Sequence, residues 1–272
     1  MRFLKLVSSA FFLSIIVLSV QTSAQTALKN AELLEKSGLV HAVSGIPDAM
    51  LSLAERAPQT NPNLDPKFLQ AWRTTTPIAY NADKILHIID EGLEKELTAE
   101  DKRDLIAYYN SPLGRRTTEL ENAAANADAQ IQEYAKNPEA YADRLPLYRE
   151  LDSESGASGI STTIVENMGV ALQVGVFSAM NASFDIKALK TEAASEHDAH
   201  MKQAEQAVLP MFAFTYRSLS TDEVKGYITF LKTPAAKKFV KAVGSLLNDA
   251  LTTQANELGQ LVIKNLQSGS PT

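Results

Sequence analysis

Several common features are missing from this chain of 272 residues, and the first is cysteine. Without a thiol, the protein can have neither a disulfide framework nor a lipid anchor on a cysteine behind a leader. The chain also lacks an excess of positive charge, because 26 Lys and Arg stand against 32 Asp and Glu, for a net charge of −6. This balance argues against general nucleic-acid binding, which requires a basic surface.

Signatures of common enzymes and of β-structure are absent from the sequence as well. It has no Gly-x-Ser-x-Gly nucleophile motif, no phosphate-binding glycine loop and no dinucleotide-binding fingerprint. It also has no Asn-Gly or Asp-Gly pair between alternating segments, the strongest short-range signal for a β-hairpin. The sequence therefore favours a protein without strands, without a cofactor and without catalytic activity.

The N-terminus has the organisation of a secretory signal peptide. Arg2 and Lys5 precede an apolar run over residues 6–20, and small residues follow at positions 22–24. We predict cleavage after Ala24. The run is shorter than the roughly 20 apolar residues that span a membrane, and no later segment is long and apolar enough. We expect a periplasmic or secreted mature protein of 248 residues (272 minus 24) with a charge near −8 (−6 minus 2).

The rest of the sequence predicts α-helices. It is rich in Ala, Leu, Glu, Lys and Gln, which favour helix, and its apolar residues recur three and four positions apart, as on one helix face. Two such stripes are Leu86, Ile89, Leu93, Leu97 and Val240, Val243, Leu247, Leu251. We therefore predict an all-α fold.

Helix boundaries are well marked in residues 97–116. Thr98 can cap a helix whose first turn carries Glu100 and Asp101, where the helix dipole favours acids. Pro112 ends that helix, because proline disfavours helical geometry in the residue before it. A new helix can then start with Ser111 as its N-cap and Pro112 at its first position.

The same boundaries recur 122 residues later, in residues 219–238. Ser220 and Glu223 form a capping box, and Thr233 and Pro234 repeat the break. A gap-free comparison gives the identical pairs Leu97/Leu219, Ile106/Ile228 and Pro112/Pro234, and the conservative pairs include Tyr108/Phe230, Arg115/Lys237 and Arg116/Lys238. We interpret this recurrence as an internal duplication of a helical module.

The duplication divides the mature chain into two predicted repeats, residues 25–152 and 153–267. A short helix starting at Pro138 precedes the boundary, which lies in a polar stretch over residues 152–159 that is typical of a loop or linker. We expect residues 268–272 to be a disordered tail. The repeats should pack as one helical bundle or as two paired bundles.

Two segments are unusually apolar. Residues 164–180 are apolar on nearly every face, as in a helix at the centre of a bundle. Gly169 and Gly175 would let neighbouring helices approach closely, at a cost of about 1 kcal/mol each in helix propensity. The second segment contains Met201, Met211, Phe212, Phe214 and Tyr216. We assign it to the core, and only an exposed patch would indicate a groove for peptides or lipids.

Residues 108–116 resemble the signature of a bacterial domain-of-unknown-function family, DUF2059. The signature is two aromatics, Ser-Pro, a glycine and a basic residue after an acidic helix start; here these are Tyr108, Tyr109, Ser111, Pro112, Gly114 and Arg115. Residues 230–237 match it more loosely, with Leu231 for the second aromatic and Ala236 for the glycine. The resemblance implies a secreted all-helical protein with two copies of the module. It implies no activity and no catalytic residues.

The candidate metal site is His197 and His200, which lie three residues apart on one helix face. Glu192 or Glu196 can complete a coordination shell. The spacing differs from the His-Glu-x-x-His pattern of zinc proteases. An exposed helix of mixed charge explains these residues equally, so we assign no metal. His41 and His87 stand alone in sequence, and we expect them to be partly buried packing residues.

The candidate binding residues are two basic pairs, Arg115 with Arg116 and Lys237 with Lys238. Both pairs lie near a helix start, where each cation opposes the helix dipole by about 0.3–1 kcal/mol. A helix start with Arg or Lys suits an anion such as phosphate, carboxylate or a lipid head group. The alternative is an ordinary salt bridge to an acidic neighbour such as Glu100 or Asp101 across the helix turn.

The sequence leaves three functions open. The first is an exported, non-enzymatic envelope protein that binds a protein partner or a small anionic or apolar ligand. The second is a metal-dependent hydrolase centred on His197 and His200. The third is a structural or stress-related periplasmic protein without a small ligand.

Overall fold

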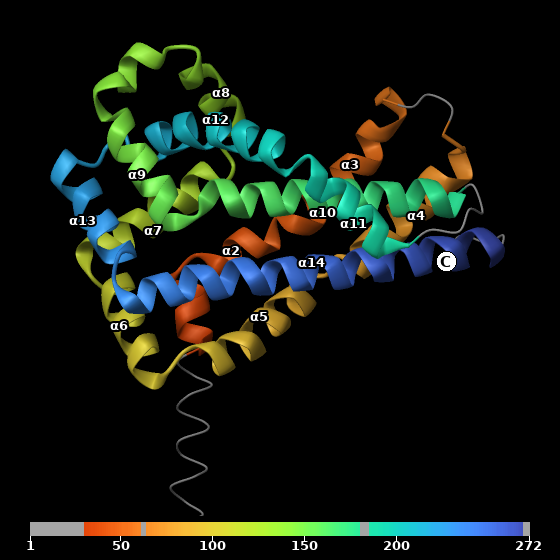
Figure 1. Ribbon diagram of the computed structural model, residues 1–272, viewed down its shortest axis with the longest axis horizontal. Coiled ribbons are helices and arrows are strands. Elements are labelled where there is room, and N and C mark those ends of the chain that lie inside the picture. The colour runs from red at the N-terminus through yellow and green to blue at the C-terminus, as the bar shows by residue number, and fades with distance from the viewer. Residues whose placement is uncertain (1–29, 61–63, 180–184, 269–272) are drawn as a thin grey trace, which may run out of the picture.

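The computed structural model describes residues 30–60, 64–179 and 185–268, and over these residues the protein is all-α (Figure 1). Helices joined by short turns make up this part of the chain, which contains no strand, as the sequence predicts. The predicted signal peptide and residues 269–272 of the predicted tail lie outside the described residues. None of the described helices is both long and apolar enough to cross a membrane.

The helices fall into three groups along the chain. After a helical segment at residues 30–36, the first group is α2 (Leu39–Ser44), α3 (Ile46–Thr60), α4 (Pro66–Ala79), α5 (Ala82–Glu96), α6 (Ala99–Tyr109) and α7 (Pro112–Ala124). The second group is α8 (Asp128–Ala135), the 3₁₀ helix η1 (Pro138–Arg144) and α9 (Leu145–Ser155). The third group is α10 (Ala157–Ala179), α11 (Ile186–Ser195), α12 (His197–Thr215), α13 (Thr221–Leu231) and α14 (Pro234–Ser268).

The predicted helix starts in the first motif are confirmed. Thr98 caps α6 by accepting a hydrogen bond from the Asp101 backbone N–H at 3.1 Å, and the Asp101 carboxylate accepts one from the Thr98 N–H at 3.0 Å. Ser111 caps α7 by accepting a hydrogen bond from the Gly114 N–H at 3.0 Å, with Pro112 as the first helical residue. These contacts satisfy backbone donors that a helix start leaves without partners.

The predicted starts in the second motif are confirmed as well. Ser220 and Glu223 form the reciprocal capping box of α13, with distances of 3.2 and 2.7 Å. Thr233 accepts a hydrogen bond from the Ala236 N–H at 3.3 Å and so caps α14. Local sequence therefore sets the same succession of helix start, break and restart at both places.

The polar stretch over residues 152–159 is helical except at Gly156, so the prediction of a loop there is wrong. Gly156 ends α9 with a φ of 65°, in the left-handed region that favours glycine. The Asp152 carboxylate accepts hydrogen bonds from the Ser158 backbone N–H at 2.8 Å and from its hydroxyl at 2.6 Å. These polar residues therefore connect two helices directly, because they cap the start of α10.

The long helices α10 and α14 run beside each other through the middle of the molecule (Figure 1). α14 also packs on α4 and α5, whereas α10 packs on α11 and α12. The predicted apolar stripes face this interior, where the buried members are Ile89, Leu93, Leu97, Val243, Leu247 and Leu251. All six belong to one core cluster that combines residues of both predicted repeats.

The apolar helix α10 is central but not buried on every face. Val170, Ala171 and Val174 are buried, whereas Val165 is 46 % exposed. A Cβ atom on Gly169 would meet nothing within 4 Å, so the predicted close approach at this glycine is wrong. The surroundings of Gly175, and Met180 as a whole, lie outside what the structure describes.

The two motif segments pack against each other. α6 of the first motif contacts α14 of the second, and α7 of the first contacts α13 of the second. The first helix of each motif therefore packs on the second helix of the other. At the centre, the rings of Tyr108 and Phe230 stack with centroids 3.5 Å apart and planes 3° from parallel. Tyr109 meets Phe230 edge-on, with centroids 5.6 Å apart. The sequence comparison pairs Tyr108 with Phe230, and the fold brings these two residues into direct contact.

Candidate functional site

The second residue of each basic pair forms an ion pair with a capping-box acid of the other motif. Arg116 of α7 binds Glu223 of α13 at 2.5 Å and also donates to the Ser218 carbonyl at 2.8 Å. Lys238 of α14 binds the two carboxylate oxygens of Asp101, in α6, at 3.1 and 2.9 Å. Each acid therefore caps its own helix and holds a cation from the opposite helix pair.

The first residue of each basic pair contacts a different acceptor. Arg115 donates to the Asn110 carbonyl at 2.5 Å, and the Lys237 ammonium lies 3.6 Å from the carboxylate of Glu154. The four basic side chains of the motifs thus contact separate groups of the protein, and no two of them share an acceptor. Of the two acids predicted for the alternative salt bridge, Asp101 does bind a basic residue, but this residue is Lys238 of the other motif and not a neighbour across the helix turn. Glu100 lies 3.9 Å from Arg103 instead.

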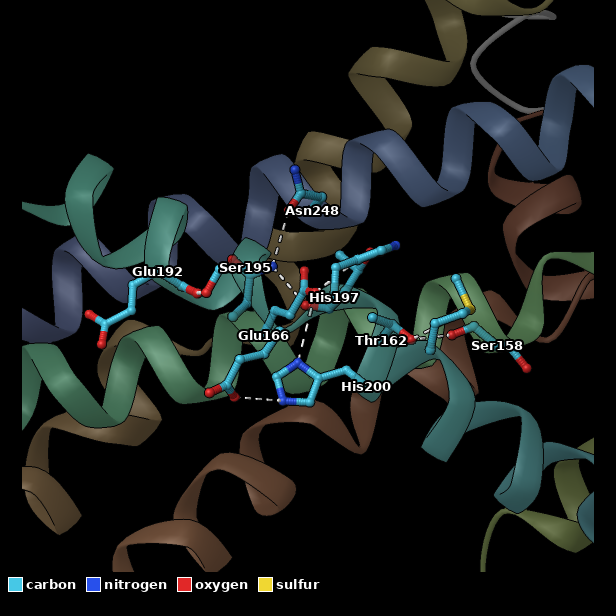
Figure 2. Close-up of polar contacts among 12 residues, drawn as sticks. Ser158, Thr162, Glu166, Glu192, Ser195, His197, His200 and Asn248 are labelled. Carbon is cyan, nitrogen blue, oxygen red and sulfur yellow. Dashed lines mark hydrogen bonds and ion pairs between the residues drawn. The ribbon is translucent and has the colours of Figure 1, made fainter.

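The two candidate metal-ligating histidines both approach Glu166 of α10 (Figure 2). His197 Nδ1 lies 2.9 Å from Glu166 Oε1, and His200 Nδ1 lies 3.9 Å from the same oxygen. His200 Nε2 lies 3.6 Å from the Glu196 carboxylate. The sequence indicates Glu196 as a possible partner but not Glu166, because this acid comes from a helix more than 30 residues earlier.

The histidines outside this pair are not packing residues. His41 and His87 are both exposed, so the expectation of partial burial is wrong. His87 Nε2 lies 3.4 Å from the exposed Glu91 carboxylate, one helix turn away. Within the described ranges, no group of three or more His, Cys, Asp and Glu side chains is arranged to hold a metal ion.

A different polar group lies where α7, α12 and α13 meet. Glu121 Oε1 accepts a hydrogen bond from the Tyr216 hydroxyl at 2.6 Å and another from the Tyr227 hydroxyl at 2.9 Å. Both tyrosines are buried, and Glu121 is partly buried. The carboxylate of the first predicted repeat is thus held by two phenols of the second.

Glu121 and both phenols line a cavity of about 380 Å³ between α7, α8, α9, α10, α12 and α13. Its walls are largely apolar and include Ile131, Met211 and Phe212. Asp128 supplies a second carboxylate, and no lysine, arginine or histidine of the described residues lines the space. We refer to it as the Glu121 cavity. It has the size and the sparse, convergent polar groups that are typical of a small-molecule site.

The environment of Glu121 changes its acid–base properties. Burial raises the pKa of its carboxyl above the ordinary value, and the hydrogen bonds from Tyr216 and Tyr227 oppose this rise in part. Burial also raises the pKa of both phenols, and the nearby carboxylate raises it further. The two tyrosines therefore remain protonated hydrogen-bond donors at neutral pH.

A second, somewhat larger cavity of about 440 Å³ lies between α9, α10 and α12. Its lining includes Arg149, Asp152 and Glu205. The acid Asp152 already accepts two hydrogen bonds from Ser158 as the cap of α10. The Glu121 cavity is therefore the better candidate site, because the Glu121 carboxylate lies in its wall and, unlike Asp152, does not cap a helix.

The sequence alone does not indicate Glu121 or Tyr227 as site residues, and it predicts Met211, Phe212 and Tyr216 in the core. Those three residues do pack in the core, but each also lines the Glu121 cavity. Helical spacing alone places Glu121 on the same face as Thr117 and Ala124. That this face is the inner face of α7 follows only from the structure, in which both of these neighbours are buried.

Comparison with known proteins gives one family match. Residues 83–137 match a family described as an uncharacterized protein conserved in bacteria, DUF2059. No curated protein and no solved structure matches the chain significantly. The matched range runs from α5 to the end of α8 and includes the motif at residues 108–116 as well as Glu121 and Asp128; the second motif lies outside it. Residues 83–137 are therefore similar to the DUF2059 family, in agreement with the resemblance of the first motif, and the match does not extend to a second copy.

Proposed function

We propose that the protein is an exported, non-enzymatic component of the bacterial envelope that binds a small, largely apolar ligand in the Glu121 cavity. The observation that carries this proposal is the cavity itself, about 380 Å³ of mainly apolar space with a hydrogen-bonded carboxylate in its wall. Apolar walls supply affinity and a few polar groups fix orientation, as in most small-molecule sites. The basic pairs are no part of this site, since none of the four residues lines the cavity and their contacts lie on other groups of the protein.

Binding can be tested with a neutral apolar fluorophore, N-phenyl-1-naphthylamine. Ala125 lines the cavity, so Ala125→Phe should fill it and abolish the fluorescence increase that the mature protein produces. The matched control is Ala123→Phe, which changes an exposed alanine of the same helix that does not line the cavity. Absence of binding by the unchanged protein would overturn the proposal and favour a structural or stress-related role.

The proposal of export rests on the N-terminal sequence, with two cations before an apolar run and small residues at positions 22–24. Mass spectrometry of the protein from a periplasmic fraction should find Gln25 at its N-terminus. A full-length chain confined to the cytoplasm would contradict this part of the proposal.

We also propose that the two halves arose by duplication. Arg116 and Lys238 are equivalent positions 122 residues apart, and so are Asp101 and Glu223. The ion pairs Arg116–Glu223 and Lys238–Asp101 therefore repeat the same contact in both directions, and Tyr108 stacks on its own counterpart Phe230. Such reciprocal contacts are typical of a twofold interface between identical chains. A family member with a single module should accordingly form a dimer in light-scattering measurements, and a stable single-module monomer would count against the duplication.

A further inference from the structure

We propose that the Glu121 cavity binds an organic cation, a primary ammonium group carried on an apolar body. This inference rests on the proposed function and names the chemical class of its ligand. Three observations support it. They are the charge of the polar groups that line the cavity, the aromatic rings in its wall, and the contacts that hold the basic residues of the two motifs away from it.

The Glu121 carboxylate accepts hydrogen bonds from two phenols, but no positively charged side chain of the described residues lines the cavity. Tyr216 and Tyr227 both donate to the same oxygen, Oε1, and no described residue hydrogen-bonds to Oε2. Asp128 adds a second acid to the lining, and no basic side chain of the described residues lines it. Glu121 is partly buried, and a carboxylate that is largely withdrawn from water is ordinarily paired with a cation, because a buried charge without a counter-charge is costly. A ligand ammonium group would supply the missing positive charge.

The walls suit the rest of such a ligand. Phe212, Tyr216 and Tyr227 bring aromatic rings to the lining, and the Phe212 and Tyr216 rings lie 5.6 Å apart, between their centroids. Aromatic faces attract cations, and the attraction is stronger where water is excluded. Ile131 and Met211 line the same cavity and can cover an alkyl or aromatic body.

An anionic ligand is disfavoured at this site. Glu121 and Asp128 would repel it, and the cations that the sequence offers for anion binding are held elsewhere. Arg116 binds Glu223 and Lys238 binds Asp101, so neither contributes positive charge to the cavity lining. The charge of the cavity thus selects against carboxylates and phosphates and for an amine.

The test compares three probes of equal length by calorimetry at pH 7.5 on the mature protein: octylammonium, octanol and octanoate. We expect octylammonium to bind at least tenfold more tightly than octanol, and octanoate to bind most weakly. Glu121→Gln should remove the preference for the cation, whereas Glu121→Asp should keep part of it because the charge remains. The matched control is Glu119→Gln, an exposed acid on the same helix, which should change nothing.

The outcomes separate the ligand class from the proposed function. Equal binding of octanol and octylammonium, or a cation affinity unchanged in a folded Glu121→Gln variant, would overturn the cation proposal while leaving an apolar-ligand site in place. Failure of every probe, including N-phenyl-1-naphthylamine, would overturn the proposed function and the ligand class together. Circular dichroism of each variant shows that its fold is intact before affinities are compared.

Discussion

At the scale of single residues, Glu121 shows how one carboxyl group can serve packing and binding at once. Its Oε1 joins α7 to Tyr216 and Tyr227 across the boundary between the predicted repeats. Because burial raises its pKa, the folded protein holds the Glu121 proton more tightly than the unfolded chain does. Ionisation of Glu121 therefore costs more free energy in the folded protein without a ligand cation than it does in the unfolded chain.

This raised pKa predicts a pH dependence of stability. The contribution of Glu121 is fully present below its ordinary pKa of 4.5 and is lost as the pH rises through the higher folded-state pKa. Glu121→Gln cannot ionise, so its stability should rise relative to the unchanged protein as the pH increases from 4.5 to neutrality. Each unit of pKa difference corresponds to about 1.4 kcal/mol in the free energy of unfolding.

Urea denaturation at a series of pH values measures this difference. Glu119→Gln serves as the control, since this acid is exposed on the same helix and should follow the unchanged protein at every pH. A constant gap between Glu121→Gln and the unchanged protein from pH 4.5 to 7.5 would contradict the assigned pKa direction.

Asp101 behaves in the opposite way, because its charged form is the stabilised one. The hydrogen bond from Lys238 is the main cause that holds the pKa of Asp101 below its ordinary value of 3.8, and the contacts with Thr98 lower it further. Its stabilising contribution is therefore present above pH 3.8 and is lost as the pH falls through the lower folded-state pKa.

Asp101→Asn should consequently destabilise the protein at pH 7. The change weakens both the cap of α6 and the contact with Lys238, and the loss of a helix cap costs about 1 kcal/mol. The destabilisation should shrink as the pH falls through the lower folded-state pKa of Asp101, because the carboxyl of the unchanged protein then becomes protonated as well. Asp104→Asn, at an exposed position on the same helix, provides the comparison in parallel urea titrations.

At the scale of helices, the two motifs differ in the tightness of their turns. A Cβ atom on Gly114 would lie 2.1 Å from the Tyr108 carbonyl oxygen and 2.8 Å from Tyr109 Cα, both backbone atoms that cannot move aside cheaply. The second motif has the buried Ala236 at the matching place and therefore accommodates a methyl group there. Glycine is thus a structural requirement of the α6–α7 turn only.

Gly114→Ala should destabilise the protein by roughly 1–3 kcal/mol, because it forces the backbone at the turn to shift. The reciprocal change, Ala236→Gly, should cost only about 1 kcal/mol, through lower helix propensity and a lost buried methyl group. Thermal unfolding followed by circular dichroism compares the two variants directly. A smaller loss for Gly114→Ala than for Ala236→Gly would show that the turn relaxes.

At the scale of the whole molecule, the two predicted repeats share one interior. α14 packs on α4 and α5, and α7 packs on α12 and α13, so helices of each half complete the core of the other. Burial of apolar surface is the main source of stability for a chain without disulfides. Neither half can bury its apolar faces without the other.

A fragment of residues 25–156 should therefore fail to fold as a monomer, and so should one of residues 157–272. Mixing or coexpressing the two should restore the helical circular dichroism and the cooperative unfolding of the intact chain. A fragment that alone unfolds cooperatively as a monomer would contradict the shared core. Light scattering distinguishes a folded monomer from a self-associated species.

Local sequence by itself determined the helices and most of their ends, because caps such as Thr98, Ser111 and Ser220 act through hydrogen bonds within three residues. The prediction of a loop at residues 152–159 was wrong, because loops and helix caps use the same types of polar residue, and only the Asp152–Ser158 contact distinguishes a cap here.

Only the tertiary structure decided which elements meet. It paired Arg116 with Glu223 and Lys238 with Asp101, and it brought Glu121 to two phenols about 100 residues away. The physical reason is that helix formation depends on neighbours along the chain, whereas a cavity and its charge depend on packing between distant segments.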